Sequence, residues 1–162
     1  MQGDKETVWH DSAYVLDLTN QKLEWVKLPK PPFVRRALSV AAYQGNVFAI
    51  GGMQKAGKPA TDVFIYDPSN SLWSKGPKLP GEPIEGFGSS AFAQGGRLYV
   101  STIKGNLQRL SEDGLQWETV EQLENARFFH RMLPYGKSKL VMVGGANMGV
   151  GKFDSVEVVE LD

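Results

Sequence analysis

The chain has 162 residues, of which 41% are hydrophobic and 10% aromatic, and it contains no cysteine. This composition is sufficient for a packed core, and the lack of cysteine excludes a disulfide framework, thiol catalysis and cysteine-ligated metal. Its 18 Lys and Arg residues balance 18 Asp and Glu residues, so the basic excess typical of a nucleic-acid-binding protein is missing. No apolar run approaches the ~20 residues of a transmembrane helix, so the sequence predicts no membrane span.

Short runs with strand character follow one another along the chain and are separated by turn residues. The first two lie around Tyr14 and Trp25. Four more are predicted at 38–43, 47–50, 62–66 and 72–74, and another four at 89–93, 97–101, 106–110 and 116–120. A third group opens at 127–130, includes the apolar run 140–143 and ends with a strand at 155–161. No segment keeps a helical apolar period, so the prediction is an all-β fold.

Two landmarks recur at a fixed interval. Trp25, Trp73 and Trp117 are spaced 48 and 44 residues apart, and each closes the same kind of segment. The run that ends in Gly51-Gly52 returns 93 residues later as the run that ends in Gly144-Gly145. Periods of this size indicate a repeat architecture, and four antiparallel strands per repeat predict the blades of a β-propeller.

One stretch carries the complete repeat pattern. From Val47 to Pro80, a hydrophobic strand ends in Gly-Gly and is followed by Tyr66-Asp67, Trp73 and Leu-Pro, a pattern that resembles the kelch repeat. The resemblance covers essentially the whole chain and implies a kelch-type β-propeller segment of about three and a half four-stranded antiparallel blades. It also implies a structural role for the residues that recur: Gly51, Gly52, Tyr66, Trp25, Trp73, Trp117, Gly144 and Gly145.

The strands of each unit are named a to d in chain order, and the units are expected to divide at fixed places. Residues 1–29 form a half blade with strands c and d, 30–80 and 81–123 form full blades, and 124–162 form a blade without strand d. Ser101-Thr102 stands where the second full blade should have Gly-Gly. A closed propeller has at least ~4 blades. The chain is therefore expected to be a fragment, with the remaining blades supplied by flanking sequence or by another chain.

The topology predicts which loops share a face. The loops that join strands b and c, and those that join strand d to the next strand a, lie at one end of the blades, where the first residues of the a strands surround a central mouth. Arg36-x-x-Ser39 and Arg127-x-x-His130 resemble the arginine-led opening of kelch strand a. The candidate ligand-binding residues around this mouth are Arg35, Arg36, Glu85, Arg127, His130 and Arg131, with Trp9, which lies outside the tryptophan repeat, as a stacking residue.

Each candidate also has a structural interpretation. The arginines could pair with acidic neighbours or brace the next blade, and His130 could hydrogen-bond between blades instead of acting as a general acid or base. Two histidines without cysteine cannot form a zinc site alone, and the acidic residues lack metal-ligand spacing. The sequence therefore predicts no catalytic residue, no metal and no cofactor.

Two functions fit this pattern. The first is a non-enzymatic module that binds a protein or a glycan through the bc and da loops. The alternative, implied by a resemblance to bacterial kelch proteins of the sialic-acid-mutarotase type, is part of a sugar-processing enzyme with Arg36, Arg127 and His130 at the mouth. The same resemblance favours a location outside the cytoplasm.

Overall fold

The computed structural model describes residues 9–161, and strands dominate this part of the chain. Two sheets have four antiparallel strands each, in the orders β3-β4-β5-β6 and β7-β8-β9-β10. The first comprises β3 (Ser39–Tyr43), β4 (Asn46–Ile50), β5 (Val63–Asp67) and β6 (Leu72–Gly76). The second comprises β7 (Ser90–Gln94), β8 (Arg97–Ser101), β9 (Asn106–Leu110) and β10 (Trp117–Gln122).

Smaller sheets flank these two blades. The pair β1 (Tyr14–Leu16) and β2 (Trp25–Lys27) precedes them, and β11 (Arg131–Tyr135), β12 (Lys139–Val143) and β15 (Val156–Glu160) follow them. The sequence did not predict the short hairpin β13 (Ala146–Asn147) and β14 (Gly151–Lys152) within the last bc loop. A 3-10 turn, η1 (Pro83–Gly86), lies between the two full blades. The predicted fold class, about three and a half antiparallel blades, is confirmed.

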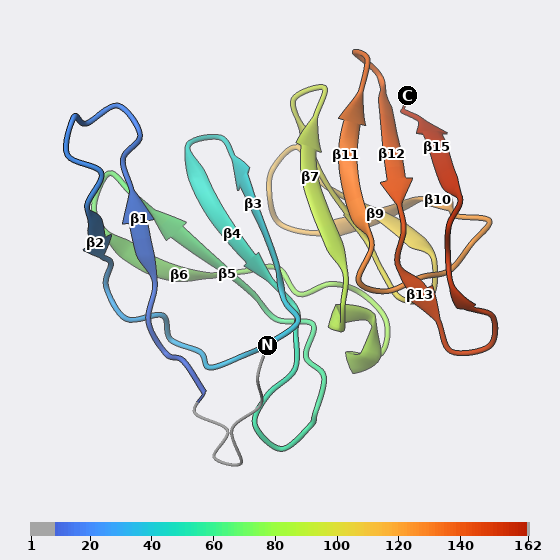
Figure 1. The fold of residues 1–162 in the computed structure, drawn as a ribbon, viewed down its shortest axis with the longest axis horizontal. Helices are drawn as coiled ribbons and strands as arrows, with labels where there is room; N and C mark the ends of the chain where they lie inside the picture. The colour runs from blue at the N-terminus through green and yellow to red at the C-terminus, as the bar shows by residue number, and fades with distance from the viewer. Residues whose placement is uncertain (1–8, 162) are drawn as a thin grey trace.

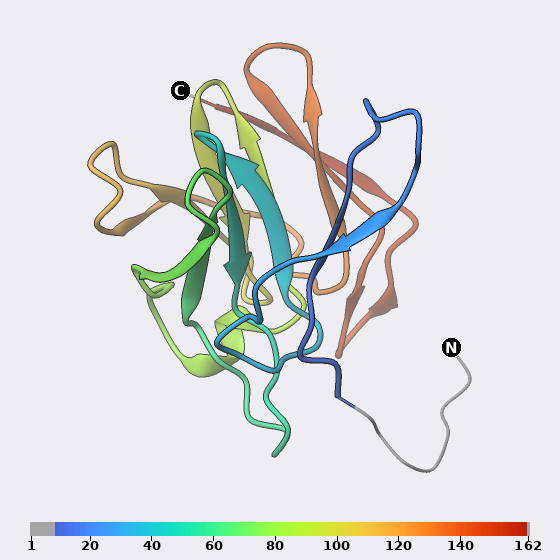
Figure 2. The ribbon, with the colours of Figure 1, turned by 90° about the vertical axis from the view of Figure 1, so that its left-hand side faces the viewer.

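The sheets are arranged around a common inner edge. Strand β3 contacts β7, and β7 contacts β11, so the three strands lie side by side (Figures 1 and 2). The hairpin turns that join the a and b strands project from one end, whereas η1 and the β13–β14 hairpin lie at the opposite end (Figure 1). The bc and da loops therefore share one end of the molecule. The exact division of the chain into blades stays a prediction, and residues 1–8 lie outside the described part.

Two apolar cores hold neighbouring blades together, because each sheet turns a face toward the next. The alternation along β3, in which Ser39, Ala41 and Tyr43 are buried and the residues between them exposed, is typical of a strand with one buried face. The first core joins the two full blades, and its members are Ala41, Tyr43, Phe48, Ile50, Val63, Leu79, Leu98, Val100, Leu110 and Trp117. The second joins β7–β10 to β11–β15 and comprises Tyr99, Leu107, Leu123, Met132, Leu140, Met142 and Val159.

The repeated tryptophans occupy different environments. The indole N–H of Trp117 donates to Pro77 O at 2.9 Å, and that of Trp73 donates to Pro29 O at 3.1 Å, so each ties its blade to the linker before it. Trp25 differs, since it is 67% exposed. The packing between blades that its repeat position predicted is absent within residues 9–161, because β1 and β2 form a pair without inner strands to cover them.

The Gly-Gly pairs end strand b in a conformation that other residues rarely adopt. Gly51 and Gly52 have φ of 66° and 95°, and Gly144 and Gly145 have φ of 65° and 91°. A Cβ on Gly51 would lie 2.4 Å from Gly86 O, so the pair also allows two backbones to meet. Among the described residues, no helix is long and apolar enough to cross a membrane.

Candidate functional site

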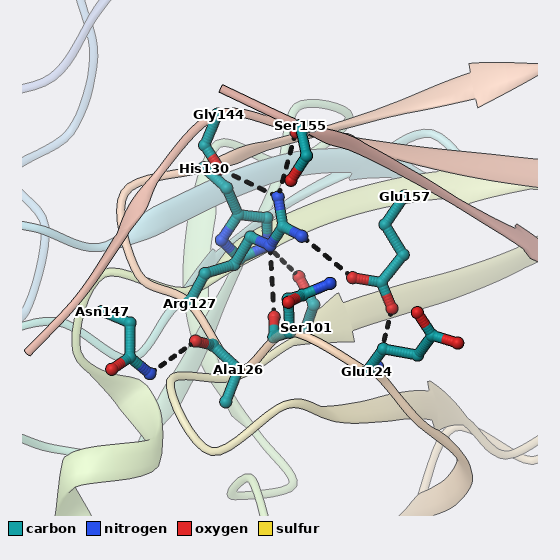
Figure 3. Close-up of polar contacts among 10 residues, drawn as sticks. Ser101, Glu124, Ala126, Arg127, His130, Gly144, Asn147, Ser155 and Glu157 are labelled. Carbon is teal, nitrogen blue, oxygen red and sulfur yellow. Dashed lines mark hydrogen bonds and ion pairs between the residues drawn. The ribbon is translucent and has the colours of Figure 1, made fainter. Parts of the chain in front are cut away.

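Arg127 is the centre of a buried hydrogen-bond network at the bc/da end (Figure 3). Its guanidinium donates to the carbonyl oxygens of Asn125 and Gly144 at 3.1 Å each and to that of Ser155 at 3.4 Å. It also pairs with Glu157 Oε2 at 3.0 Å, and the Arg127 side chain has no exposed surface. Its donors face the protein interior, so Arg127 joins the start of β11 to strands b and c of its own blade.

Arg35 makes the corresponding contacts in the first full blade. It donates to Gly51 O at 2.9 Å and to Asp62 O at 3.1 Å, and it pairs with Asp62 Oδ2 at 2.9 Å. Partial burial raises the pKa of Asp62, but hydrogen bonds and charges from Lys78 and Arg35 outweigh this effect and lower the pKa below its ordinary value. Arg35 is thus the equivalent of Arg127. The sequence pattern matched Arg36 to Arg127, and this match is wrong by one residue.

The second full blade replaces this ion pair with a different contact. Gly86 precedes the inner strand β7 by the same number of residues as Arg35 precedes β3 and Arg127 precedes β11. It therefore takes the place of these arginines. Glu85, which is only 2% exposed, accepts hydrogen bonds from Asn106 Nδ2 at 3.2 Å to each carboxylate oxygen. The Glu85 carboxylate is therefore occupied inside the blade and does not face the mouth.

His130 is buried between the last two blades. It has no exposed surface, and its Nε2 shares a hydrogen bond with the hydroxyl of Ser101 on β8. Its Nδ1 has no hydrogen-bond partner among the described residues. Burial, assisted by the charges of Arg127 and Arg131, lowers the pKa of His130 from 6.5 to about 4. A neutral imidazole in this position links blades, in agreement with the structural interpretation of this residue.

The lowered pKa predicts that His130 makes folding pH-dependent. Between the unfolded pKa of 6.5 and the folded pKa of about 4, the unfolded chain binds a proton that the folded chain excludes. Stability should therefore fall as the pH drops through this window, by about 2 kcal/mol at about pH 4.5 relative to pH 7. Urea unfolding of wild type and His130→Asn at both pH values measures this contribution. An equal loss in both proteins would show that His130 does not cause it.

Three of the predicted candidates remain accessible. The Arg36 guanidinium lies 5.3 Å from the ring centroid of Trp9, and its Nη2 is 3.6 Å from the sulfur of Met53. Arg36 is exposed and Trp9 is partly exposed. Arg131, at the start of β11, is also exposed. The structure thus brings Trp9 and Arg36 together, a pairing that the sequence did not indicate.

The expectation that six charged residues line one mouth needs correction. Arg35, Glu85 and Arg127 are held inside their blades by partners on or beside strands b and c, and His130 is held between blades by a partner on the preceding sheet. Within residues 9–161, no group of three or more His, Asp or Glu residues is placed to hold a metal ion.

Sequence reasoning missed one exposed aromatic residue. Phe129 stands directly before the buried His130, is 56% exposed and has a φ of 56°. Its position in the Arg-Phe-Phe-His segment gave no signal, because a left-handed backbone at phenylalanine is unusual and is visible only in the structure.

Comparisons with known proteins agree with this fold. A model of the kelch motif matches residues 35–80. N-acetylneuraminate epimerase from Escherichia coli O9:H4 (strain HS) is 27% identical over 140 residues, which cover 80% of this chain and 36% of the relative. Kelch-like protein 21 from Danio rerio is 36% identical over 95 residues, which cover 58% of this chain and 15% of the relative.

The solved structure of YjhT superposes with a TM-score of 0.77 at 16% sequence identity, over 94% of this chain and 50% of YjhT. Together with the blade topology, these similarities show that the chain is a kelch-repeat β-propeller segment. It spans 36% of the length of the curated epimerase it matches.

Proposed function

We propose that this chain is a non-enzymatic, glycan-binding part of a kelch propeller and that it binds its ligand at the bc/da end. The observation that carries the proposal is the accessible stack of Arg36 on Trp9. A guanidinium offers a planar set of donors that matches a carboxylate, and an aromatic ring offers a flat apolar surface to the C–H face of a sugar. Together they favour an acidic glycan.

Two further observations support this choice. The chain is similar to proteins named N-acetylneuraminate epimerase, and N-acetylneuraminate is a carboxylated sugar. Two of the side chains near this end that could act as a general acid or base, His130 and Glu85, are buried, whereas Glu82 in the same loop is exposed and pairs with Lys104. A buried group cannot reach a substrate, so neither His130 nor Glu85 can act as the general acid or base, and this supports binding over catalysis.

Replacing Arg36 by alanine tests the proposal. We expect Arg36→Ala to weaken binding of an N-acetylneuraminate-terminated oligosaccharide by about tenfold in calorimetric titration, because a charge-assisted hydrogen bond to the carboxylate is lost. Arg97→Ala is the matched control: Arg97 begins β8 at the opposite end of the blade and pairs with Glu112. Equal binding by both variants would place the ligand elsewhere. A wild-type protein that retains only proteins and no glycan would contradict the proposal.

The similarity to the epimerases favours one alternative, that the chain is part of an enzyme that acts on N-acetylneuraminate. Proton NMR of N-acetylneuraminate with and without the protein separates the two functions. Protein-dependent conversion of the sugar, lost with Arg36→Ala and kept with Arg97→Ala, would establish the enzyme. A stable spectrum combined with calorimetric binding would support the binding module.

A further inference from the structure

Met53 lies against the accessible guanidinium of Arg36, with its thioether sulfur 3.6 Å from Arg36 Nη2. The same guanidinium lies over the ring of Trp9, 5.3 Å from its centroid. A thioether sulfur is a weak hydrogen-bond acceptor, so it leaves the guanidinium available to an anion. A chemical change at this sulfur would therefore alter the surroundings of Arg36 directly.

The backbone fixes Met53 in this position. Arg36 and Met53 form an antiparallel bridge, in which Arg36 N donates to Met53 O at 3.1 Å and Met53 N donates to Arg36 O at 2.8 Å. A second antiparallel bridge joins Met53 to Pro59 in the same bc loop. Because the backbone of Met53 is bridged on both sides, its side chain is anchored within reach of Arg36.

The fold does not require a methionine at this position. The equivalent bridge of the last blade joins Phe128 to Ala146, with backbone hydrogen bonds of 2.9 Å in both directions. Ala146 directly follows the last Gly-Gly pair, as Met53 directly follows the first. The bridge thus accepts a side chain as short as that of alanine, and the length of Met53 serves its contact with Arg36.

Solvent access divides the methionines between residues 9 and 161 into two pairs. Met132 and Met142 belong to the second core and are 2% and 0% exposed, so reagents in water do not reach them. Met148, in the β13–β14 hairpin, is 90% exposed, and Met53 is partly exposed. Peroxides oxidise methionine sulfur where solvent reaches it. Met53 and Met148 are therefore open to oxidation, and Met53 is the one that contacts Arg36.

We propose that Met53 is an oxidation site, at which a peroxide converts the thioether to a sulfoxide and the sulfoxide withdraws Arg36 from its ligand. In this step the O–O bond of hydrogen peroxide breaks, one oxygen atom forms a bond to the sulfur, and the other leaves as water. The sulfur is oxidised and the peroxide is reduced. Methionine sulfoxide reductases reverse the change, so the modification can act as a switch.

The effect on Arg36 follows from the polarity of the new group. A sulfoxide oxygen carries partial negative charge and accepts a hydrogen bond from a guanidinium, whereas the thioether is nearly apolar. Once formed beside Arg36, this oxygen occupies a donor of the planar fork and repels an incoming carboxylate. The inference rests on the proposed glycan-binding function for its effect on the ligand, and it predicts that oxidation weakens binding.

Calorimetric titration of an N-acetylneuraminate-terminated oligosaccharide before and after treatment with hydrogen peroxide tests the inference, with tandem mass spectrometry to locate the added oxygen. Wild type should gain oxygen at Met53 and bind about fivefold more weakly, an effect of the size of one hydrogen bond. Reduction by the two epimer-specific methionine sulfoxide reductases should restore the affinity. The affinity of Met53→Leu, which keeps a similar side-chain volume, should not change on peroxide treatment, whereas Met148→Leu should respond as wild type does.

Hydrogen exchange of the Arg36 guanidinium, measured by NMR, gives a readout that needs no ligand. Its N–H protons should exchange with solvent more slowly after oxidation, and those of the exposed Arg131 should not change. Unchanged exchange at Arg36, or oxidation of Met148 without oxidation of Met53, would overturn the inference. If oxidation of Met53 leaves the affinity unchanged while Arg36→Ala weakens it, this inference is wrong and the proposed function stands. If Arg36→Ala binds the oligosaccharide as wild type does, both are wrong.

Discussion

Gly86→Ala is expected to destabilise the chain by about 4 kcal/mol or more, a loss typical of a severe core or backbone clash. A Cβ at this position would lie 1.8 Å from the carbonyl oxygen of Ala60 and 3.0 Å from the Cα of Gly51. Neither atom belongs to a flexible side chain. The backbone N–H of Gly52 also donates to Gly86 O at 2.7 Å, so the two loops cannot separate without breaking this contact between blades.

Urea unfolding of the two proteins measures the effect. Gly149→Ala is a suitable control, because its Cβ would contact only the side chain of Asn147 at 3.4 Å in an exposed hairpin, and we expect a change of less than about 0.5 kcal/mol. If Gly86→Ala cost no more than Gly149→Ala, the close approach between η1 and the first bc loop would not exist in solution.

The second large effect is expected for Arg127→Met. Removing the guanidinium leaves the carboxylate of Glu157, whose side chain is 11% exposed, without its cation, and leaves three carbonyl oxygens without a donor. Breaking a buried ion pair from one side costs about 3–5 kcal/mol, because the remaining charge stays buried and uncompensated. Chemical unfolding should therefore show a large decrease in stability.

Arg109→Met is the matched control for this prediction. Arg109 pairs with Glu118 at 3.2 Å on neighbouring strands, but both side chains are partly exposed, so its loss should cost less than about 1 kcal/mol. A similarly small loss for Arg127→Met would mean that its hydrogen bonds do not support the blade, and the ligand-binding role first predicted for Arg127 would regain support. A large loss assigns Arg127 to the framework.

The difference between Arg36 and its neighbour Arg35 shows where sequence reasoning reached its limit. Both arginines precede the same strand, and both fitted an arginine-led repeat opening. The alignment depends on the length of the turn between strands a and b, which is longer between Tyr135 and Lys139 than between Tyr43 and Asn46. Only the strand register shows that Arg35 is the buried residue and Arg36 the accessible one.

The second blade illustrates the same limit. The presence of Ser101-Thr102 in place of Gly-Gly was visible in the sequence as a departure from the repeat. The presence of Gly86 in place of the arginine was not. In the structure, both changes occur in the blade that exchanges an arginine–carboxylate pair for the Glu85–Asn106 contact. These residues are far apart in the chain and become neighbours only through the sheet, so no local pattern connects them.

The sequence by itself determined the all-β class, the order of strands and the kelch-repeat propeller, because strand alternation and turn residues act locally and recur with a fixed period. Tertiary structure alone decided which charged residues are accessible, because burial and pairing depend on the strands and blades that a side chain meets. It placed Arg35, Arg127 and His130 inside the framework, left Arg36 and Arg131 exposed, and presented Phe129 to solvent.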